Sequence, residues 1–209
     1  MIYCIVDRQV SELYTGFPWA SLGNGKVVDI GGGNGHISIG LARVRKTIPI
    51  FLPYPQYTKH IQLFPSLHFI VQDISPHMLP ALQTEQQDIS SRVIFLTHDF
   101  FTPQPGYSAS APIVFLLRQF LHNYNDSDAI KILRQVVPAL ERCSRGTPLL
   151  INDVVLPDSG EVATFEEHYL RQIDLCIMVT LGAKQRSEGE WNRLIKEADE
   201  RLEVVKVLG

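Results

Sequence analysis

A short apolar run followed by a cluster of glycines constrains this chain more than any other feature of its sequence. Residues 26–35 read KVVDIGGGNG, with Asp29 inside the run and glycine at four of the five positions from 31 to 35. The residues from His36 onward have the apolar spacing of a helix. A strand that leads into a helix through glycines lets backbone N–H groups approach an anionic ligand. The sequence therefore predicts a nucleotide-type site directly after a buried strand.

Composition narrows the class of protein. The 209 residues carry a net charge of −3 and contain no basic block, which argues against nucleic acid as the main partner. Asp7 and Arg8 come too early for a secretory signal, and the longest apolar runs, such as 113–117, are far too short to span a membrane. The three cysteines lack metal-ligand spacing. We therefore expect a cytoplasmic globular protein with no membrane segment and no metal site.

Strand and helix patterns alternate along the chain, which predicts an α/β fold with a doubly wound, mostly parallel sheet. In such sheets ligands bind beyond the carboxyl ends of the strands. The expected helices are 36–45, a helix from Ser75, 125–137 with Pro138 ending or kinking it, 161–181 and 188–199. The expected strands, six in all, are 26–30, 67–73, 92–100, 111–117, 147–157 and 201–207.

Residues 44–62 do not fit this alternation. They contain three prolines and no acid, and they separate Asp29 from Asp73 by 44 positions. The usual spacing between a glycine turn and the acid of the next strand is about 20 residues. Removing residues 44–62 nearly restores that spacing. The segment is either a surface insertion or translated intron, and the sequence leaves both open.

Two nucleotide-binding patterns compete at the glycines. The dinucleotide fingerprint requires a third glycine where this chain has His36, and it has no acid at the position of Asp29. The stretch DIGGGNG instead resembles motif I of class I S-adenosylmethionine-dependent methyltransferases. That cofactor has an ammonium suited to an acid, a carboxylate suited to backbone donors and a ribose diol suited to a second acid. Asp29 and Asp73, which close the first two expected strands, match those needs.

Beyond this motif, nearly the whole chain outside 44–62 resembles the plant and fungal O-methyltransferases, the family that includes caffeic acid O-methyltransferase. The matching stretches are WASLG, VVDIGGGNGHISI, FIVQDIS, RVIFLTHDFF, FLLRQFLHNYND, LLINDVVLP and the final GAKQRSEGEWNRLIKEADERLEVVKV. The resemblance implies metal-free transfer of a methyl group from S-adenosyl-L-methionine to a hydroxyl, usually phenolic, of a small secondary metabolite.

The resemblance also assigns roles to residues. His122 takes the place of the general base, and Asp153 that of an acid orienting it. An imidazole suits the first role because it titrates near neutrality. Gln185 stands where many members carry a second acid, and Asp126 is expected to cap the following helix. Asp73 is expected on the ribose, and Asp99 with Phe100 around the adenine. The complete expected cofactor set is Asp29, Gly31, Gly33, Gly35, Asp73, Ile74, Asp99, Phe100 and Arg118.

Family members also carry a helical N-terminal domain that forms a dimer and closes the acceptor pocket. Against that pattern we expect residues 1–25 to be a lead-in segment and 26–209 to be the methyltransferase domain. The final antiparallel strand of the family sheet has no counterpart in the sequence, which predicts a gap between the fifth and sixth strands. Three functions stay open: an O-methyltransferase, a catalytically impaired remnant or binding module with the same fold, and a nicotinamide-dependent oxidoreductase.

Overall fold

The computed structural model describes residues 2–6, 13, 16–42, 64, 66–75, 90–107 and 111–208. These residues form a seven-stranded sheet in the order β4-β3-β2-β5-β6-β1-β9, and every neighbouring pair in it is parallel. In chain order the strands are β1 Ile2–Val6, β2 Lys26–Ile30, β3 His68–Asp73, β4 Val93–Thr97, β5 Ile113–Arg118, β6 Leu149–Asp153 and β9 Val204–Leu208. The predicted α/β class with a doubly wound parallel sheet is confirmed.

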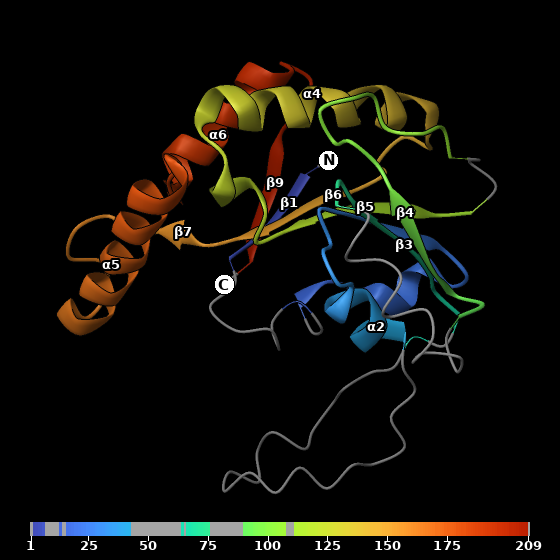
Figure 1. Cartoon of the computed structure of the whole chain (residues 1–209), viewed down its shortest axis with the longest axis horizontal. Coiled ribbons are helices and arrows are strands. Elements are labelled where there is room, and N and C mark those ends of the chain that lie inside the picture. The colour runs from blue at the N-terminus through green and yellow to red at the C-terminus, as the bar shows by residue number, and fades with distance from the viewer. Residues whose placement is uncertain are drawn as a thin grey trace, which may run out of the picture.

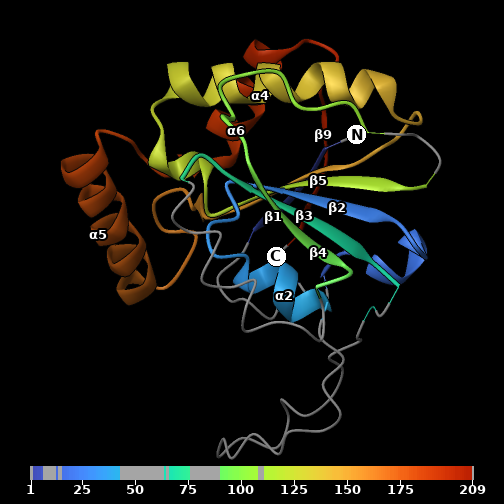
Figure 2. The same cartoon turned by 45° about the vertical axis from the view of Figure 1, so that its right-hand side comes forward.

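Helices cover both faces of this sheet (Figures 1 and 2). On one face lie α4, Asp126–Arg142, and α6, Glu188–Ala198, whose apolar side chains share a buried cluster with those of β2, β5 and β6. On the other face lie α2, His36–Ala42, and the short helix η1, Trp19–Leu22, around a second cluster. Apolar side chains alternate between the two faces, as the period of a strand requires, so each face of the sheet has its own core.

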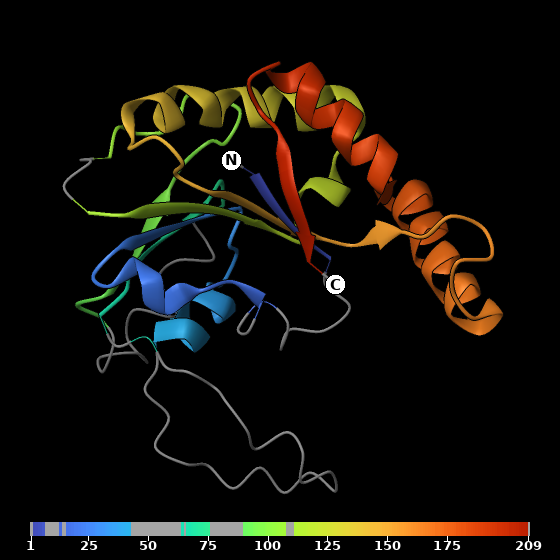
Figure 3. The same cartoon turned by 180° about the vertical axis from the view of Figure 1, so that it is seen from behind.

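The helix α5, Thr164–Leu181, projects from the side of the sheet (Figure 3). The strands that flank α5 in the chain, β7, Val155–Leu156, and β8, Arg186–Ser187, pair with each other as a two-stranded ladder. Among the described residues of α5 only Leu170 is buried. Its exposed large apolar side chains are Phe165, Tyr169, Leu175, Met178, Val179 and Leu181. Six exposed large apolar side chains on one helix are more than the scattered single residues that are normal on a protein surface.

The prediction of six strands, with a gap between the last two in sequence, is wrong. β1 lies between β6 and β9 and pairs with both, with Ile5 opposite Asn152 on one side and Leu208 on the other (Figure 3). Backbone N–H and C=O groups of neighbouring strands need partners, and the apolar segment IYCIV supplies them. Residues 2–6 therefore belong to the same sheet as the strands of 26–208. The expected segment 44–62 and the helix expected after Ser75 lie outside the described residues.

The expected end of α4 at Val137 and its expected cap at Asp126 are also wrong. The helix continues through Pro138 to Arg142, so Pro138 does not end it, and a kink at Pro138 stays a prediction. Its N-cap is Asn125, whose side chain accepts a hydrogen bond of 3.0 Å from Asp128 N, so Asp126 does not cap it. Asp126 instead forms ion pairs with Lys184, Arg186 and Arg193. A helix with extensive buried packing tolerates an internal proline because tertiary contacts offset the lost hydrogen bond.

Candidate active site

The glycine loop after β2 has a backbone conformation and close neighbours that only glycine allows. Gly31, Gly33 and Gly35 have φ values of 68°, 55° and 69°, in the left-handed region that favours glycine. A Cβ at Gly31 would lie 2.2 Å from the ring of Phe120, and a Cβ at Gly35 would lie 2.8 Å from the ring of Phe95. The loop therefore packs closely against one aromatic ring in each of the two cores and has no room for side chains at these positions.

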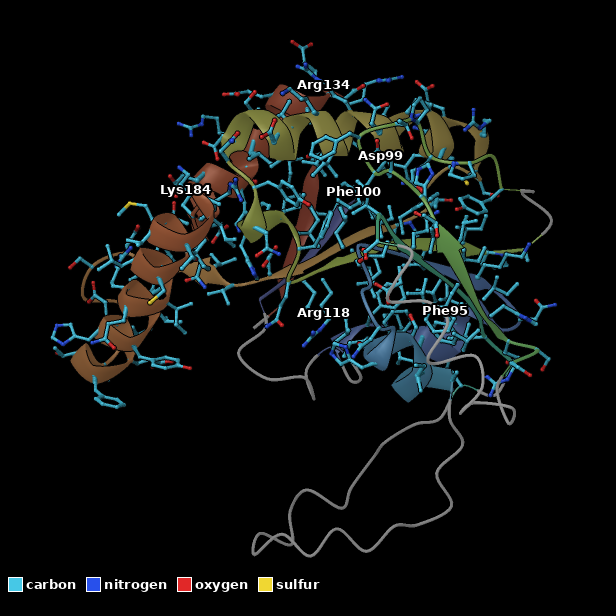
Figure 4. All side chains as sticks on the ribbon, in the orientation of Figure 1. Phe95, Asp99, Phe100, Arg118, Arg134 and Lys184 are labelled. Carbon is cyan, nitrogen blue, oxygen red and sulfur yellow. The ribbon has the colours of Figure 1, made fainter. Side chains whose placement is uncertain are left out.

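A cavity of about 310 Å³ opens over this loop. Its size lies at the lower end of the range for small-molecule sites, roughly 300–1,000 Å³. Four of the predicted cofactor residues line it: Asp29, Gly31, Gly33 and Arg118. Its other lining residues are Gly32, Asn34, His36, Ile37 and Gln119. Figure 4 shows Arg118 close to the start of α2.

Sequence reasoning did not assign Asn34, His36 or Gln119 to the site. Asn34 belongs to the glycine loop and His36 is the first residue of α2, and Asn34 Oδ1 lies 2.9 Å from His36 Nδ1. Their position in the motif was a signal that could have identified them. Gln119 carried no such signal, since only the turn after β5 brings it to the cavity. Its φ of 43° is the one positive value among the described non-glycine residues, which indicates local backbone strain next to the cavity.

Asp29 is the buried acid of the site, with 3% of its surface exposed. Burial raises its pKa to about 6, opposed by a hydrogen bond from Ser38 and by the charge of Arg118. The Ser38 hydroxyl donates that hydrogen bond to Asp29 Oδ2 over 2.6 Å. Burial and the charge of Arg118 also lower the pKa of His36. Arg118 therefore acts electrostatically on both titratable groups of the cavity.

Asp73 holds the glycine loop from the end of β3. Gly33 N donates to its Oδ2 over 3.1 Å, and Ser75 N donates to its Oδ1 over 3.0 Å. Each carboxylate oxygen accepts more than one hydrogen bond, so these contacts leave acceptor capacity for a hydroxyl. Asp73 is not among the residues that line the cavity. Ile74, next in the chain, is 48% exposed.

Asp99 and Phe100 follow β4, and they differ in environment. Asp99 is exposed, and its Oδ1 accepts a hydrogen bond of 2.9 Å from Phe101 N. Phe100 is 3% exposed, and its ring packs edge-on against Phe120 at 4.8 Å and Tyr124 at 5.7 Å. Figure 4 shows Phe100 on the α4 side of the sheet. The structure therefore places Phe100 in the core behind the site, and its expected contact with adenine stays a prediction.

His122 and Asp153 come together at the carboxyl ends of two neighbouring strands. His122 lies in η4, Leu121–Asn123, directly after β5, and Asp153 is the last residue of β6. The Nδ1 atom of His122 contacts Asp153 Oδ1, and its backbone N donates to Asp153 Oδ2 over 3.3 Å. The side chain of Asp153 is 0% exposed and that of His122 is 17% exposed. Because a carboxylate only accepts, this contact assigns a proton to Nδ1, so in the neutral imidazole Nε2 is the nitrogen that carries the lone pair.

Gln185 lies in the loop between α5 and β8, and it is 3% exposed. Its backbone N donates to Asp174 Oδ1 over 2.7 Å. Its side-chain oxygen is buried, and no described residue donates a hydrogen bond to it.

No group of three or more potential metal ligands occurs in the described part of the chain. None of the described helices is long and apolar enough to cross a membrane.

This chain is similar in sequence and in structure to known enzymes. O-methyltransferase sol2 of Alternaria solani is 46% identical over 203 residues, which cover 97% of this chain and 42% of that protein. A solved structure of LepI in complex with S-adenosylmethionine is 29% identical, with a TM-score of 0.59 over 82% of this chain and 36% of that one. A structure described as a pericyclic reaction enzyme is 28% identical, with a TM-score of 0.62 over 87% and 41%.

The chain thus spans less than half the length of the relatives it matches. The sequence model of the O-methyltransferase domain matches residues 57–199, more than half of the chain. The chain therefore belongs to the O-methyltransferase domain family.

Proposed function

We propose that this chain is the catalytic part of an S-adenosylmethionine-dependent O-methyltransferase that acts on a hydroxyl, phenolic in the simplest case, of a small secondary metabolite. The observation that carries this proposal is the pairing of His122 with Asp153 at the same edge of the sheet as the glycine loop. Family membership and the fungal O-methyltransferases among the relatives support it. Without that pair, the loop alone would support only binding.

The residues of the cavity fit S-adenosylmethionine. The bare loop offers backbone N–H groups to a carboxylate, and Asp29 offers a buried acid to an ammonium. Arg118 adds a cation on the same wall. We assign Asp73 to the ribose diol and Asp99 to the adenine side. When bound, the cofactor supplies a methyl group that its sulfonium already activates for transfer.

The chain's own part in the reaction is orientation and proton removal. A phenol is a poor nucleophile until its proton leaves, and His122 Nε2 is placed to accept that proton. Asp153 keeps the other proton on Nδ1 and stabilises the imidazolium that forms. Alignment of the acceptor oxygen with the methyl carbon provides much of the remaining rate, as it does when a bimolecular step becomes unimolecular.

The first test concerns His122. We expect His122→Gln to bind S-adenosylhomocysteine like the parent and to transfer methyl groups to a phenol panel roughly 10²–10⁴-fold more slowly. The matched control is His68→Gln, at the exposed amino end of β3, which should leave the rate unchanged. Equal rates for His122→Gln and the parent at neutral pH would exclude the general-base role.

The second test concerns Asp73. We expect Asp73→Ala to weaken binding of S-adenosylhomocysteine at least about tenfold, because a hydrogen bond to a charged group contributes roughly 1.5–3 kcal/mol. Calorimetry measures this directly, with Asp158→Ala, in an exposed turn, as the control. Unchanged affinity in a folded Asp73→Ala variant would remove Asp73 from the cofactor site.

A second candidate is a protein that binds the cofactor without methyl transfer. Two points favour it: the family resemblance implies an acid where this chain has the buried Gln185, and one similar structure is described as a pericyclic reaction enzyme. An amide cannot stabilise an imidazolium by charge. Tight binding of S-adenosylhomocysteine together with no methylated product across the phenol panel would support this candidate over the first.

A further inference from the structure

Arg186, in β8, carries a positive charge that the fold places entirely out of water. Its side chain is 0% exposed. A buried guanidinium is unfavourable unless its donors are satisfied. Here Nε donates to Asp126 Oδ1 over 2.9 Å, and the ring of Trp191 lies 5.2 Å from Cζ. The two terminal nitrogens donate to backbone carbonyls, Nη1 to Leu121 O over 3.0 Å and Nη2 to Tyr124 O over 2.8 Å.

These acceptors all lie in one short segment of the chain. Leu121 immediately precedes His122, and Tyr124 follows it by two residues, so the two carbonyl contacts enclose the turn that carries the imidazole. Asp126 begins α4 directly afterwards. The guanidinium is planar and rigid, so its two carbonyl contacts fix the position of the turn, and its contact with Asp126 ties it to the start of α4.

We propose that Arg186 is a positioning residue for His122. It acts through the backbone carbonyls of Leu121 and Tyr124, while Asp153 contacts the imidazole ring and the backbone N of His122. The two supports come from different strands, β6 and β8, and together they fix where Nε2 meets an acceptor hydroxyl. This inference rests on the proposed function, since it assigns Arg186 a part in the same proton transfer.

The two carbonyl contacts, and not the ion pair, distinguish Arg186 from its neighbours. Asp126 Oδ2 also lies 3.4 Å from Lys184 Nζ and 3.3 Å from Arg193 Nη2. Its charge therefore keeps partners when Arg186 is replaced. A lysine at 186 would keep the charge but present one ammonium in place of a three-point fork. Positioning should therefore be lost in Arg186→Lys even though the charge is kept.

The test compares Arg186→Lys with two controls in the full chain. Arg134→Lys removes a similar pair of contacts, because Arg134 on α4 donates to Glu197 O and Ala198 O at the end of α6 (Figure 4). Arg193→Gln removes another cation from Asp126. The first measurement is the ¹⁵N chemical shifts of the His122 ring, which report the tautomer. The second is kcat and KM for methyl transfer to a phenol.

We expect Arg186→Lys to shift the His122 ring toward a mixture of tautomers and to lower kcat up to about 10²-fold, the scale of a 1 Å misplacement. KM for S-adenosylmethionine and both controls should stay at the parent values. A lower melting temperature with unchanged ring shifts and unchanged kcat would overturn the proposal, because Arg186 would then only stabilise the fold.

The experiment also gives an answer if the parent is inactive or if Arg186→Lys does not fold. If the parent itself transfers no methyl group, the proposed function fails, but the ring shifts still decide whether Arg186 orders the turn. If Arg186→Lys does not fold, Asp126→Asn takes its place, since it leaves both carbonyl contacts intact. The proposal then requires the His122 ring shifts of Asp126→Asn to match those of the parent. Altered ring shifts would overturn it, because they would show that the ion pair with Asp126 positions the turn.

Discussion

Asp29 is a carboxyl group that folding places almost completely out of water, and its ionisation opposes the stability of the fold. Its pKa rises from 3.8 to about 6, mainly because of burial. Below pH 3.8 the group is protonated in both the folded and the unfolded chain. As the pH rises toward 6 the unfolded chain releases the proton first, so stability falls, and above pH 6 the full penalty is present.

We therefore expect Asp29→Asn to stabilise the ligand-free protein above pH 6 and to have little effect near pH 4. A shift of two pKa units corresponds to about 3 kcal/mol, which is the upper bound for the gain. The asparagine keeps an oxygen that can accept the Ser38 hydrogen bond. Urea unfolding at the two pH values measures the effect. A variant less stable than the parent at both would contradict this account.

Asp199 provides a control of opposite sign. Hydrogen bonds from Arg201 lower its pKa to about 2. An acid with a lowered pKa stabilises the fold above its ordinary pKa, and this contribution is lost as the pH falls toward 2. Asp199→Asn should therefore lose stability at neutral pH, where Asp29→Asn gains it. Opposite effects of the two variants would show that burial raises the pKa of Asp29 and that hydrogen bonds lower the pKa of Asp199.

At the scale of elements, the sequence predicted those strands whose signal is local. β2, β3, β5 and β6 are continuous apolar runs that end in glycines or polar residues, and their observed bounds agree with the expected ones within a few residues. β1 is also an apolar run, but its place between β6 and β9 depends on backbone pairing with segments more than 140 residues away. No local pattern carries that information.

The residues of the candidate site also differ in whether a local sequence pattern predicts them. The glycine loop, Asp29, His122 and Asp153 stand in motifs at strand ends. The structure places Asp29 in the cavity over the loop and, separately, brings His122 into contact with Asp153. Arg186 has no such signal, since a lone arginine in a polar stretch is typical of a solvated surface. Its burial results from the packing of β8 and α6 against η4, which depends on the tertiary fold.

Within α4, Pro138 gives a prediction about the helix as a whole. Proline has no N–H, so the carbonyl four residues earlier, at Arg134, loses its helical partner. We expect Pro138→Ala to raise the free energy of unfolding by about 1–3 kcal/mol, because proline is roughly 3 kcal/mol less favourable than alanine inside a helix. Chemical denaturation measures this. A destabilised Pro138→Ala variant would instead show that the proline ring contributes more by packing than it costs in the backbone.

At the scale of the whole molecule, the residues that we assign to the site depend on one edge of a single sheet. The glycine loop, Asp73, His122 and Asp153 follow or end β2, β3, β5 and β6, and parallel strands bring their carboxyl ends to the same edge. β1 pairs with β6 along its length, and Val6 stands opposite Asp153. The orientation of the acid behind His122 therefore depends on a strand far from it in sequence.

The last prediction tests this dependence with Ile5→Pro. Proline within a central strand removes a ladder hydrogen bond, so we expect the free energy of unfolding to fall by about 2 kcal/mol or more. The matched control is Ser159→Pro, where Glu161 N bonds to Asp158 O and Gly160 has a φ of 86°, a turn that accepts proline at its second position. The ring ¹⁵N shifts of His122 should change in Ile5→Pro and not in Ser159→Pro, because loss of β1 frees the end of β6 that carries Asp153. Unchanged stability and ring shifts in Ile5→Pro would show that β6 and β9 hold their positions without β1.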